Sequence, residues 1–386
     1  MKEKFLRELA DIQTGPFGSQ LHKEDYVADG TPIVTVEHLG NKMFSEQNLP
    51  RVSNTDKNRL KKYVLKQGDI VFSRVGSVDR CSYVDQKHDG WMFSGRCLRV
   101  RPTSEIDSEY LYYYFCLEET KQFVRNIAVG ATMPSINTKL LGEVVVTFPE
   151  LEQQKRISGI LSAIDSKIEV NQKINDNLEQ QAAALFSSLY NRSNTEVRYT
   201  DLIQILGGGT PKTGETAYWN GNIAFFTPKD VGAPYTFITE KTITEEGLSH
   251  CNSRLYPVNT VFVTARGTVG KVGLSGVPMA MNQSCYALVG KETHQLLVYF
   301  YTLKAVDRLK HKASGAVFDA ITTRDFDSEQ IMKLSDDDAK AFLCVAEPMF
   351  QEILNNSIEN LRLSTLRDFL LPKLMSGEID VSSVQI

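Results

Sequence analysis

The chain has 386 residues, of which 42% are hydrophobic and 23% are charged, with a formal net charge of −4 at pH 7. This is ordinary globular composition with enough chain for two or three separate cores, and no run approaches the roughly 18 apolar residues of a membrane-spanning helix. The net negative charge lowers the expectation of a nucleic-acid partner, but the acidic excess falls mostly in residues 336–386 and the rest of the chain is nearly neutral.

The N-terminal segment and the cysteines indicate a reducing compartment. Residues 1–15, MKEKFLRELADIQTG, contain no apolar core and no small-residue cleavage site, so they are not a secretory signal. The six cysteines form no Cys-x-x-Cys motif and have no zinc-like spacing with histidine. We therefore expect a cytoplasmic protein without membrane contact or bound metal, in which the cysteines are reduced and mostly pack.

Residues 1–150 are predicted to form a first domain of mixed α/β structure. Short β-rich runs such as TPIVTVEHL and GDIVFSRV are separated by Gly, Pro, Asn and Asp, which is typical of strands joined by turns. The domain closes with a helical stretch rich in aromatic residues, EYLYYYFCLEETKQFVRN (109–126). Aromatic residues at this spacing more often fill a core than form a platform for a ligand, so we expect them to pack.

Residues 151–191 are predicted to form one long helix with a coiled-coil seam. Pro149 and the acidic residues Glu150 and Glu152 are typical of a helix start. Seam residues then return at alternating steps of four and three, which is the spacing of a coiled coil. The seam, which includes two asparagines, consists of Ile157, Leu161, Ile164, Ile168, Asn171, Asn175, Leu178, Ala182, Leu185 and Leu189.

The order of domain and helix is then repeated. Residues 192–335 are predicted to form a second mixed α/β domain, with β-rich runs such as NIAFFTP and NTVFVTAR. The segment that begins at Gly315 repeats the segment that begins at Gly130, and residues 336–386 carry the second helix. The corresponding seam consists of Phe342, Ala346, Met349, Ile353, Asn356, Asn360, Leu363, Arg367, Leu370 and Leu374.

The repeated asparagines predict how the two helices lie against each other. If the helices are antiparallel their midpoints meet, so that Asn171 falls near Asn360 and Asn175 falls near Asn356. Buried asparagines satisfy one another in only one register, and they would therefore fix the alignment. The alternative is that each asparagine faces solvent beside an imperfect seam. Pro348 interrupts the second seam, so we expect the first turns of that helix to be kinked or to form a separate piece.

Four segments resemble one protein family. LSTLRDFLLPKLMSGEID (363–380) closely resembles the end of the specificity subunits of Type I restriction–modification systems, and PELEQQKRISGILSAIDSKIE (149–169) resembles the usual start of their central helix. TGPFGSQLHKEDYVADGTPIV (14–34) and GGGTPKTGETAYWNGNIAFFTPKDV (207–231) look like two common openings of a target-recognition domain. The resemblance spans essentially the whole chain. One departure is SDDDAKAFLCVAEPMF (335–350), where the family usually has a Pro and Glu-Gln entry to the second helix.

The resemblance implies an α+β fold in which two target-recognition domains are separated by a long antiparallel two-helix coiled coil, with an internal pseudo-two-fold repeat. Each recognition domain would read one half of a split, asymmetric target in double-stranded DNA, and the helices would set the spacing between the halves. The helices would also dock two methyltransferase subunits, which carry S-adenosylmethionine, and restriction subunits would join the full complex. The chain itself would be non-catalytic and would hold no cofactor.

In the first domain, two basic segments carry the candidate DNA contacts. RVSNTDKNRLKKY (51–63) offers phosphate contacts or, equally, a solvated helix face. FSRVGSVDR (72–80) follows a strand on a glycine turn, where an arginine could fork onto the O6 and N7 atoms of guanine. The candidates are Lys57, Arg59, Lys61, Lys62, Ser73, Arg74, Ser77 and Arg80.

In the second domain, VTARGTVGK (263–271) occupies the corresponding turn. An arginine therefore occurs at this turn in both domains, which favours a DNA contact over a structural salt bridge. NQSC (282–285) offers side-chain amides that could read an adenine edge. The candidates are Thr210, Lys212, Lys229, Thr264, Arg266, Thr268, Lys271, Asn282 and Gln283. The base sequence of the target does not follow from these residues, because readout depends on loop placement and on DNA deformation.

The sequence carries no convincing motif for methyl transfer or DNA cleavage. An adenine methyltransferase needs an Asn/Asp-Pro-Pro-aromatic loop for the flipped base, and this chain has no Pro-Pro. GTVGKVG (267–273) lacks the glycine spacing of a phosphate-binding loop. Two alternatives stay open beside a DNA-specificity subunit: a non-catalytic assembly scaffold that binds protein partners through its two lobes, and, less favoured, a self-sufficient restriction–methylation enzyme fragment.

Overall fold

The structure is a computed structural model that describes residues 1–386 except 17, 19, 41, 233, 313–319 and 383–386. The chain divides into two compact units: unit 1 comprises residues 1–169 and 361–386, and unit 2 comprises residues 170–360. Two long helices, α6 (Leu151–Arg192) and α11 (Asp336–Ser376), contribute residues to both units. Each compact unit therefore combines one mixed α/β region with part of each long helix.

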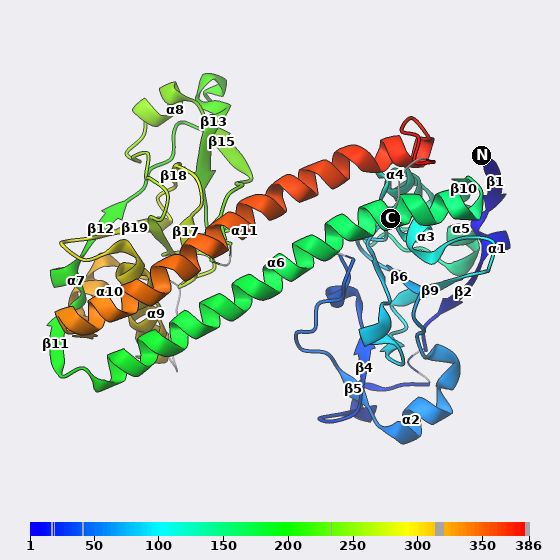
Figure 1. The fold of residues 1–386 in the computed structure, drawn as a ribbon, viewed down its shortest axis with the longest axis horizontal. Coiled ribbons are helices and arrows are strands. Elements are labelled where there is room, and N and C mark those ends of the chain that lie inside the picture. The colour runs from blue at the N-terminus through cyan, green and yellow to red at the C-terminus, as the bar shows by residue number, and fades with distance from the viewer. Residues whose placement is uncertain (17, 19, 41, 233, 313–319, 383–386) are drawn as a thin grey trace. The chain divides into compact units, whose positions relative to one another are not determined.

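The centre of unit 1 is a four-stranded antiparallel sheet (Figure 1). In spatial order its strands are β2 (Ala10–Thr14), β9 (Cys97–Pro102), β6 (Ile70–Ser73) and β7 (Cys81–Tyr83). The helices α3 (Ser108–Cys116) and α4 (Glu118–Ile127) contribute to the same core. Tyr110, Tyr113 and Phe115 of α3 are buried there with Phe72, so the expectation that this aromatic stretch packs is confirmed.

A smaller sheet in unit 1 has its own core. In spatial order its strands are β3 (Tyr26–Val27), β5 (Arg51–Val52), β4 (Thr31–Val34) and β8 (Met92–Phe93). A separate antiparallel pair joins β1 (Lys2–Phe5) to β10 (Val145–Phe148). The short helices of unit 1 are α1 (Leu6–Leu9), α2 (Asn54–Arg59) and α5 (Thr138–Gly142).

Unit 2 is built in the same way around a five-stranded sheet. In spatial order its strands are β12 (Ile203–Gly207), β19 (Cys285–Gly290), β16 (Val261–Thr264), β17 (Val272–Ser275) and β14 (Tyr235–Thr236). Helix α9 (Gln295–Lys312) packs on this sheet, and its residues Tyr299, Phe300 and Tyr301 are buried in the core.

The smaller elements of unit 2 also have counterparts in unit 1. The second sheet has the order β15 (Lys241–Ile243), β13 (Trp219–Phe226) and β18 (Met279–Met281). An antiparallel pair joins β11 (Thr195–Arg198) to β20 (Gln330–Lys333). The short helices are α7 (Tyr199–Leu202), α8 (Glu245–Ser249) and α10 (Thr323–Ser328). Within the described part of the chain, no helix has the length and apolar character needed to cross a bilayer.

The pairing of strands confirms the internal repeat. The order β2-β9-β6-β7 of unit 1 returns as β12-β19-β16-β17 in unit 2, with antiparallel pairing at every step. Each smaller sheet also contains one parallel pair, β4 with β8 and β13 with β18. The chain therefore builds one supersecondary plan twice.

In unit 2, α6 and α11 run antiparallel and pack through the predicted seam. The Nδ2 atom of Asn171 donates to Oδ1 of Asn360 at 2.9 Å, and Nδ2 of Asn356 donates to Oδ1 of Asn175 at 3.0 Å. Asn171, Asn175 and Asn356 are buried, which contradicts the alternative in which these asparagines face solvent. The structure thus contains the two pairs expected from the repeat, and their role in fixing the register stays a prediction.

In unit 1, the same two helices pack through apolar residues and one ion pair. Ile157 and Leu161 of α6 share a core with Leu371 and Leu374 of α11. Arg367, the charged member of the second seam, donates to Oδ1 of Asp165 at 2.8 Å. The hydroxyl of Tyr113 on α3 donates to Oδ2 of the same carboxylate at 2.6 Å. The charged residue of the second seam therefore has a largely buried partner on the facing helix.

The expectation of a separate first piece in the second helix is wrong. Pro348 lies inside α11, which is one continuous helix over Asp336–Ser376. A proline in a helix removes one hydrogen bond and costs about 3 kcal/mol. Phe342, Ala346 and Phe350 lie on either side of the proline and are buried in the core of unit 2, so tertiary packing holds these turns in the helix.

Candidate nucleic-acid interface

Most of the sequence-predicted DNA contacts lie at one end of the two larger sheets. Because β9 runs antiparallel to β2 and β6, the residues that follow β2 and β6 meet the residues that precede β9 and β7. We call these residues of unit 1 loop cluster 1, comprising 15–16, 74–80 and 94–96. The same reasoning defines loop cluster 2 of unit 2, comprising 208–212, 265–271 and 282–284.

Glycines permit a close crossing of the backbone in both loop clusters. A Cβ atom at Gly15 would lie 2.1 Å from the carbonyl oxygen of Ser94, and a Cβ atom at Gly208 would lie 2.2 Å from the carbonyl oxygen of Asn282. No other residue fits at such a crossing without movement of the backbone. The equivalent glycines therefore allow the 94–96 and 282–284 segments to lie close against the residues that follow β2 and β12.

Buried hydroxyls brace the turn after β6 and the turn after β16. The hydroxyl of Ser73 donates to the carbonyl oxygen of Val75 at 2.8 Å, and the hydroxyl of Thr264 donates to the carbonyl oxygen of Thr268. The amide of Ser73 donates to the carbonyl oxygen of Arg80 at 2.9 Å, as the amide of Thr264 does to that of Lys271 at 2.9 Å. Ser73 and Thr264 are buried, so they act in the frame of the turn and are not placed to meet DNA.

The hydrogen bonds also show which residues of the two turns are equivalent. The amide of Arg74 donates to the carbonyl oxygen of Arg96 at 2.8 Å, and the amide of Ala265 donates to that of Ser284 at 2.8 Å. Arg74 therefore corresponds to Ala265, and the arginine of the second turn is one residue further along, at Arg266. An arginine does occur at this turn in both units, but Arg74 and Arg266 are not structurally equivalent, and the equivalent basic residues are Arg80 and Lys271.

The other predicted residues of unit 1 fall into two groups. In loop cluster 1, Ser77 and Arg80 are exposed, while Arg74 is half-buried and donates from Nη1 to the carbonyl oxygen of Gly95 at 3.2 Å. Outside it, on α2 and the following 3₁₀ turn η3 (Lys61–Tyr63), lie Lys57, Arg59, Lys61 and Lys62.

Arg59 has structural partners on its own domain. Its Nη2 atom lies 2.7 Å from Oδ1 of Asp56, and its Nη1 atom donates to the carbonyl oxygen of Gln20 at 2.9 Å. Lys62 lies over the ring of Tyr63, with its Nζ atom 4.8 Å from the ring centroid. Lys61 is exposed and Lys57 is half-buried. The alternative of a solvated helix face accounts for these contacts, and a role in phosphate binding stays a prediction.

In unit 2, the exposed members of loop cluster 2 are Lys212, Arg266, Thr268, Lys271 and Gln283. The hydroxyl of Thr210 donates to Oε1 of Gln283, which joins two segments of the loop cluster. Two further candidates have local partners: Oδ1 of Asn282 accepts from the amide of Ser284 at 3.0 Å, and the hydroxyl of Thr268 donates to the carbonyl oxygen of Pro228 at 3.0 Å.

Lys229 lies beside loop cluster 2, on the turn that follows β13. Its side chain is 79% exposed, and its Nζ atom lies 3.6 Å from a carboxylate oxygen of Glu240, so the pairing is loose. The bond between Thr268 and Pro228 places this turn against the turn after β16. Lys229 is therefore the one predicted cation of unit 2 that approaches loop cluster 2 from the smaller sheet.

Sequence reasoning missed Arg96, which is exposed in loop cluster 1. FSGRC (93–97) occupies the position of MNQSC (281–285), because Cys97 pairs with Ser73 and Cys285 pairs with Thr264 in equivalent ladders. The shared cysteine was the available signal. Burial raises the pKa of both thiols to about 12, which marks them as packing residues.

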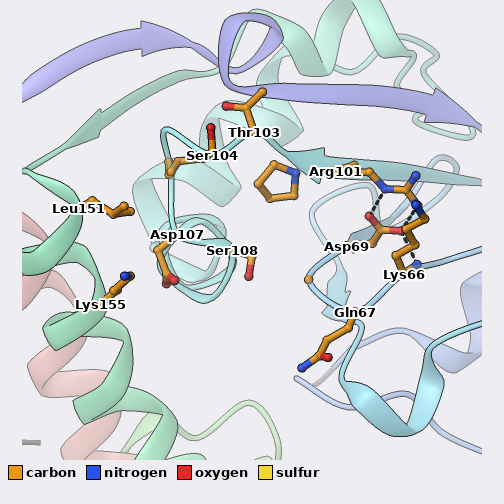
Figure 2. A pocket seen from close by; sticks show the side chains of 13 residues that line it. Lys66, Gln67, Asp69, Arg101, Thr103, Ser104, Asp107, Ser108, Leu151 and Lys155 are labelled. Atoms are coloured by element: carbon orange, nitrogen blue, oxygen red, sulfur yellow. Dashed lines mark hydrogen bonds and ion pairs between the residues drawn. The ribbon is translucent and has the colours of Figure 1, made fainter.

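Unit 1 also contains a cleft of about 410 Å³. Figure 2 shows the side chains that line it. Residues 66–69 precede β6 and residues 101–104 end and follow β9, so the cleft lies at the opposite end of the sheet. Its main charges are paired, since Arg101 donates to both carboxylate oxygens of Asp69 at 2.7 Å. None of the predicted DNA contacts lines this cleft. In the residues that the structure describes, no group of three or more His, Cys, Asp or Glu side chains could hold a metal ion.

Comparisons with known proteins match this architecture. The family model described as the Type I restriction modification DNA specificity domain matches residues 1–180 and 191–333. The Type I restriction enzyme HindI specificity subunit of Haemophilus influenzae is 25% identical, over 82% of this chain and 88% of its own length. The Type I restriction enzyme MjaIX specificity subunit of Methanocaldococcus jannaschii is 24% identical, over 74% of this chain and 72% of its own length. A crystal structure of the S subunit of a Type I restriction-modification system from M. genitalium shares the fold, with a TM-score of 0.61 at 16% identity over 97% of this chain and 95% of that chain.

Proposed function

The chain belongs to the family of Type I restriction modification DNA specificity proteins, and from this membership we propose that its two units read the two halves of one bipartite DNA target. It is a specificity subunit of a Type I restriction–modification complex. Unit 1 recognises one half of the target through loop cluster 1, and unit 2 recognises the other half through loop cluster 2.

The duplicated loop cluster is the observation that carries this proposal. Both loop clusters present exposed polar and basic side chains from a frame that is fixed by glycine crossings and buried hydroxyls. Arg80 and Lys271 occupy the same place in that frame. Phosphate contacts orient a protein on DNA while a few base contacts specify the sequence, and each loop cluster contains side chains suited to both tasks.

We assign methyl transfer to partner subunits. The chain positions DNA, and two methyltransferase subunits carry S-adenosylmethionine and dock on α6 and α11, which also set the spacing between the two DNA halves. Exposed apolar side chains on these helices suit such docking: Val170 and Ile174 are 50% and 41% exposed in unit 2, and Leu366 and Phe369 are 45% and 59% exposed in unit 1. Restriction subunits join the same complex.

Methylation of random-sequence DNA tests the proposal. The purified chain is mixed with its methyltransferase partner, S-adenosylmethionine and a random duplex library at moderate salt, and the methylated molecules are sequenced. We expect methylation confined to one bipartite motif. Partner binding with methylation that is not restricted by sequence would favour an assembly scaffold instead. Methyl transfer by the chain without its partner would contradict the assignment of chemistry to the partner.

A further inference from the structure

The two loop clusters carry an exposed cation at one equivalent position and differ in chemistry in another exposed segment. Arg80 and Lys271 are both exposed cations at the exit of equivalent turns. The segment before the buried cysteine is Ser-Gly-Arg at 94–96 but Asn-Gln-Ser at 282–284. Resting on the proposed function, we propose that Arg80 and Lys271 hold DNA phosphates, whereas Arg96 and Gln283 read base edges of two unlike half-sites.

The shared cation suits the part of DNA that every half-site has in common. The phosphate backbone carries the same charge at any sequence, so a phosphate contact requires a cation at a fixed place and no particular base. Arg80 and Lys271 meet this requirement, because each backbone carbonyl is held by the amide of a buried residue, Ser73 or Thr264, at 2.9 Å. An arginine and a lysine are interchangeable for a single phosphate oxygen to a degree that they are not for a base edge.

Arg96 has the position and the support expected of a base-reading residue. It is exposed, it directly precedes the fully buried Cys97, and its carbonyl oxygen accepts from the amide of Arg74 at 2.8 Å. The guanidinium of Arg74 also bonds the carbonyl oxygen of Gly95 at 3.2 Å, so Arg74 is a positioning residue for this segment. A guanidinium whose backbone is held in place in this way can form two hydrogen bonds with the O6 and N7 atoms of guanine.

Gln283 lies in the corresponding segment of unit 2, one residue before Ser284, which is the counterpart of Arg96, and it offers different chemistry. It is exposed, and its Oε1 atom accepts from the hydroxyl of Thr210, which restricts the side chain. The neighbouring Asn282 is less suited, because its Oδ1 atom accepts from the amide of Ser284 at 3.0 Å and caps the turn. A side-chain amide pairs best with the N6 and N7 atoms of adenine. The target is therefore asymmetric, with a guanine contact in one half and an adenine contact in the other.

Methylation by the complete complex tests this division between phosphate-binding and base-reading residues. The motif of the wild-type chain with its methyltransferase partner is first defined on a random duplex library. Arg96→Ala is then expected to lower the preference for one G·C pair about 10- to 100-fold in one half only, and Gln283→Ala to do the same for one A·T pair in the other half. Arg80→Gln and Lys271→Gln are expected to leave the motif unchanged and to weaken binding to all duplexes, with a salt slope reduced by about one.

Conservative and distant variants separate readout from damage to the fold. Arg96→Lys keeps the charge and loses the fork, so it is expected to relax the same base pair while the salt slope stays that of the wild type. Lys66→Ala, at the opposite end of the unit 1 sheet, and Lys340→Ala, on α11, are expected to change neither readout. A wild-type complex without any motif would overturn the proposed function itself. A normal wild-type motif that Arg96→Ala and Gln283→Ala leave intact, or one that Arg80→Gln or Lys271→Gln alters, would overturn this inference alone.

Discussion

Asn356 donates its side-chain amide to Oδ1 of Asn175 at 3.0 Å, inside the seam where α6 and α11 pack in unit 2. Both residues are at least nine-tenths buried. One turn away, Asn171 donates to Oδ1 of Asn360 at 2.9 Å and to a carboxylate oxygen of Glu359 at 2.7 Å. A slip of one heptad would place these amides against aliphatic seam residues, where each would lose its partner.

Removal of one amide from the Asn175–Asn356 pair is expected to destabilise unit 2. Asn175→Ala leaves the amide of Asn356 buried without its acceptor, at a cost of about 1–3 kcal/mol in the free energy of unfolding. Asn175→Leu combined with Asn356→Leu removes both polar groups and is expected to recover most of that loss. Urea unfolding monitored by circular dichroism measures both. Equal losses for the single and the double variant would show that the pair makes no specific contribution.

The ion pair of unit 1 provides a second test of the helix alignment. The side chain of Asp165 is 12% exposed and accepts from Arg367 and from the hydroxyl of Tyr113. Burial lowers the pKa of Arg367, but its hydrogen bonds to the carboxylates of Asp165 and Asp368 outweigh this effect. The pKa of Arg367 is therefore above its ordinary value. Arg367→Met is expected to lower the free energy of unfolding by about 1–3 kcal/mol, because it leaves a largely buried carboxylate without its cation. Arg362→Met, on an exposed position of the same helix, is the control and is expected to have little effect.

Adjacent glycines make a matched pair for the backbone crossing in loop cluster 2. A Cβ atom at position 208 would lie 2.2 Å from the carbonyl oxygen of Asn282, whereas a Cβ atom at position 207 meets no heavy atom within 4 Å. Gly208→Ala is expected to cost about 1–3 kcal/mol of stability and to impair recognition of one DNA half. Gly207→Ala is expected to be close to neutral in both respects. Thermal unfolding and methylation of the random library measure the two effects, and similar behaviour of the two variants would contradict the crossing.

The equivalent cysteines are expected to be inert in the folded protein. Burial raises the pKa of Cys97 and Cys285 to about 12, so both thiols stay protonated and unreactive at pH 8. Cys344 is exposed on α11 and serves as the internal reference. Iodoacetamide labelling followed by mass spectrometry should modify Cys344 in the native protein, and Cys97 and Cys285 only after denaturation. Early labelling of either buried cysteine would show that the base of its loop cluster opens.

The helices could be predicted from the sequence because the residues that pack between them recur with a regular helical spacing. Asn171 and Asn356 lie at regular steps within apolar seams, and the repeat then specifies which amide meets which. Asp165 was not identified as the partner of Arg367, because an acid just beside the seam is indistinguishable from the surface acids of the helix. Of the two alternatives expected at Pro348, the separate piece is wrong, because local propensity opposes a helix there but burial of the neighbouring aromatic residues outweighs it.

The loop clusters could be predicted only in part. The turn after β6 and the turn after β16 were found from the sequence, but their hydrogen bonds make Ala265, and not Arg266, the counterpart of Arg74. Burial of Ser73 and Thr264 was not visible either, because a hydroxyl beside an arginine is equally typical of a surface loop. Arg96 was missed because its relation to loop cluster 1 depends on a contact between segments that are distant in the chain.

An insertion of one heptad in both helices tests the role of α6 and α11 as the spacer. Seven residues placed after Glu169 in α6 and after Asn360 in α11 keep the seam in phase, because a coiled coil repeats every seven residues. Each helix becomes about 10.5 Å longer, and with a rise of about 3.4 Å per base pair the gap in the DNA motif is expected to grow by about three base pairs. The bases read in each half should stay the same, since neither loop cluster is altered. The same insertion in α6 alone shifts one part of that helix by seven residues relative to α11, so that the asparagine pairs and the Asp165–Arg367 ion pair cannot both form in register. It is expected to lower stability without yielding a longer motif. Methylation mapping of the reconstituted complex gives both the gap and the bases, and altered bases at an unchanged gap would rule out the spacer.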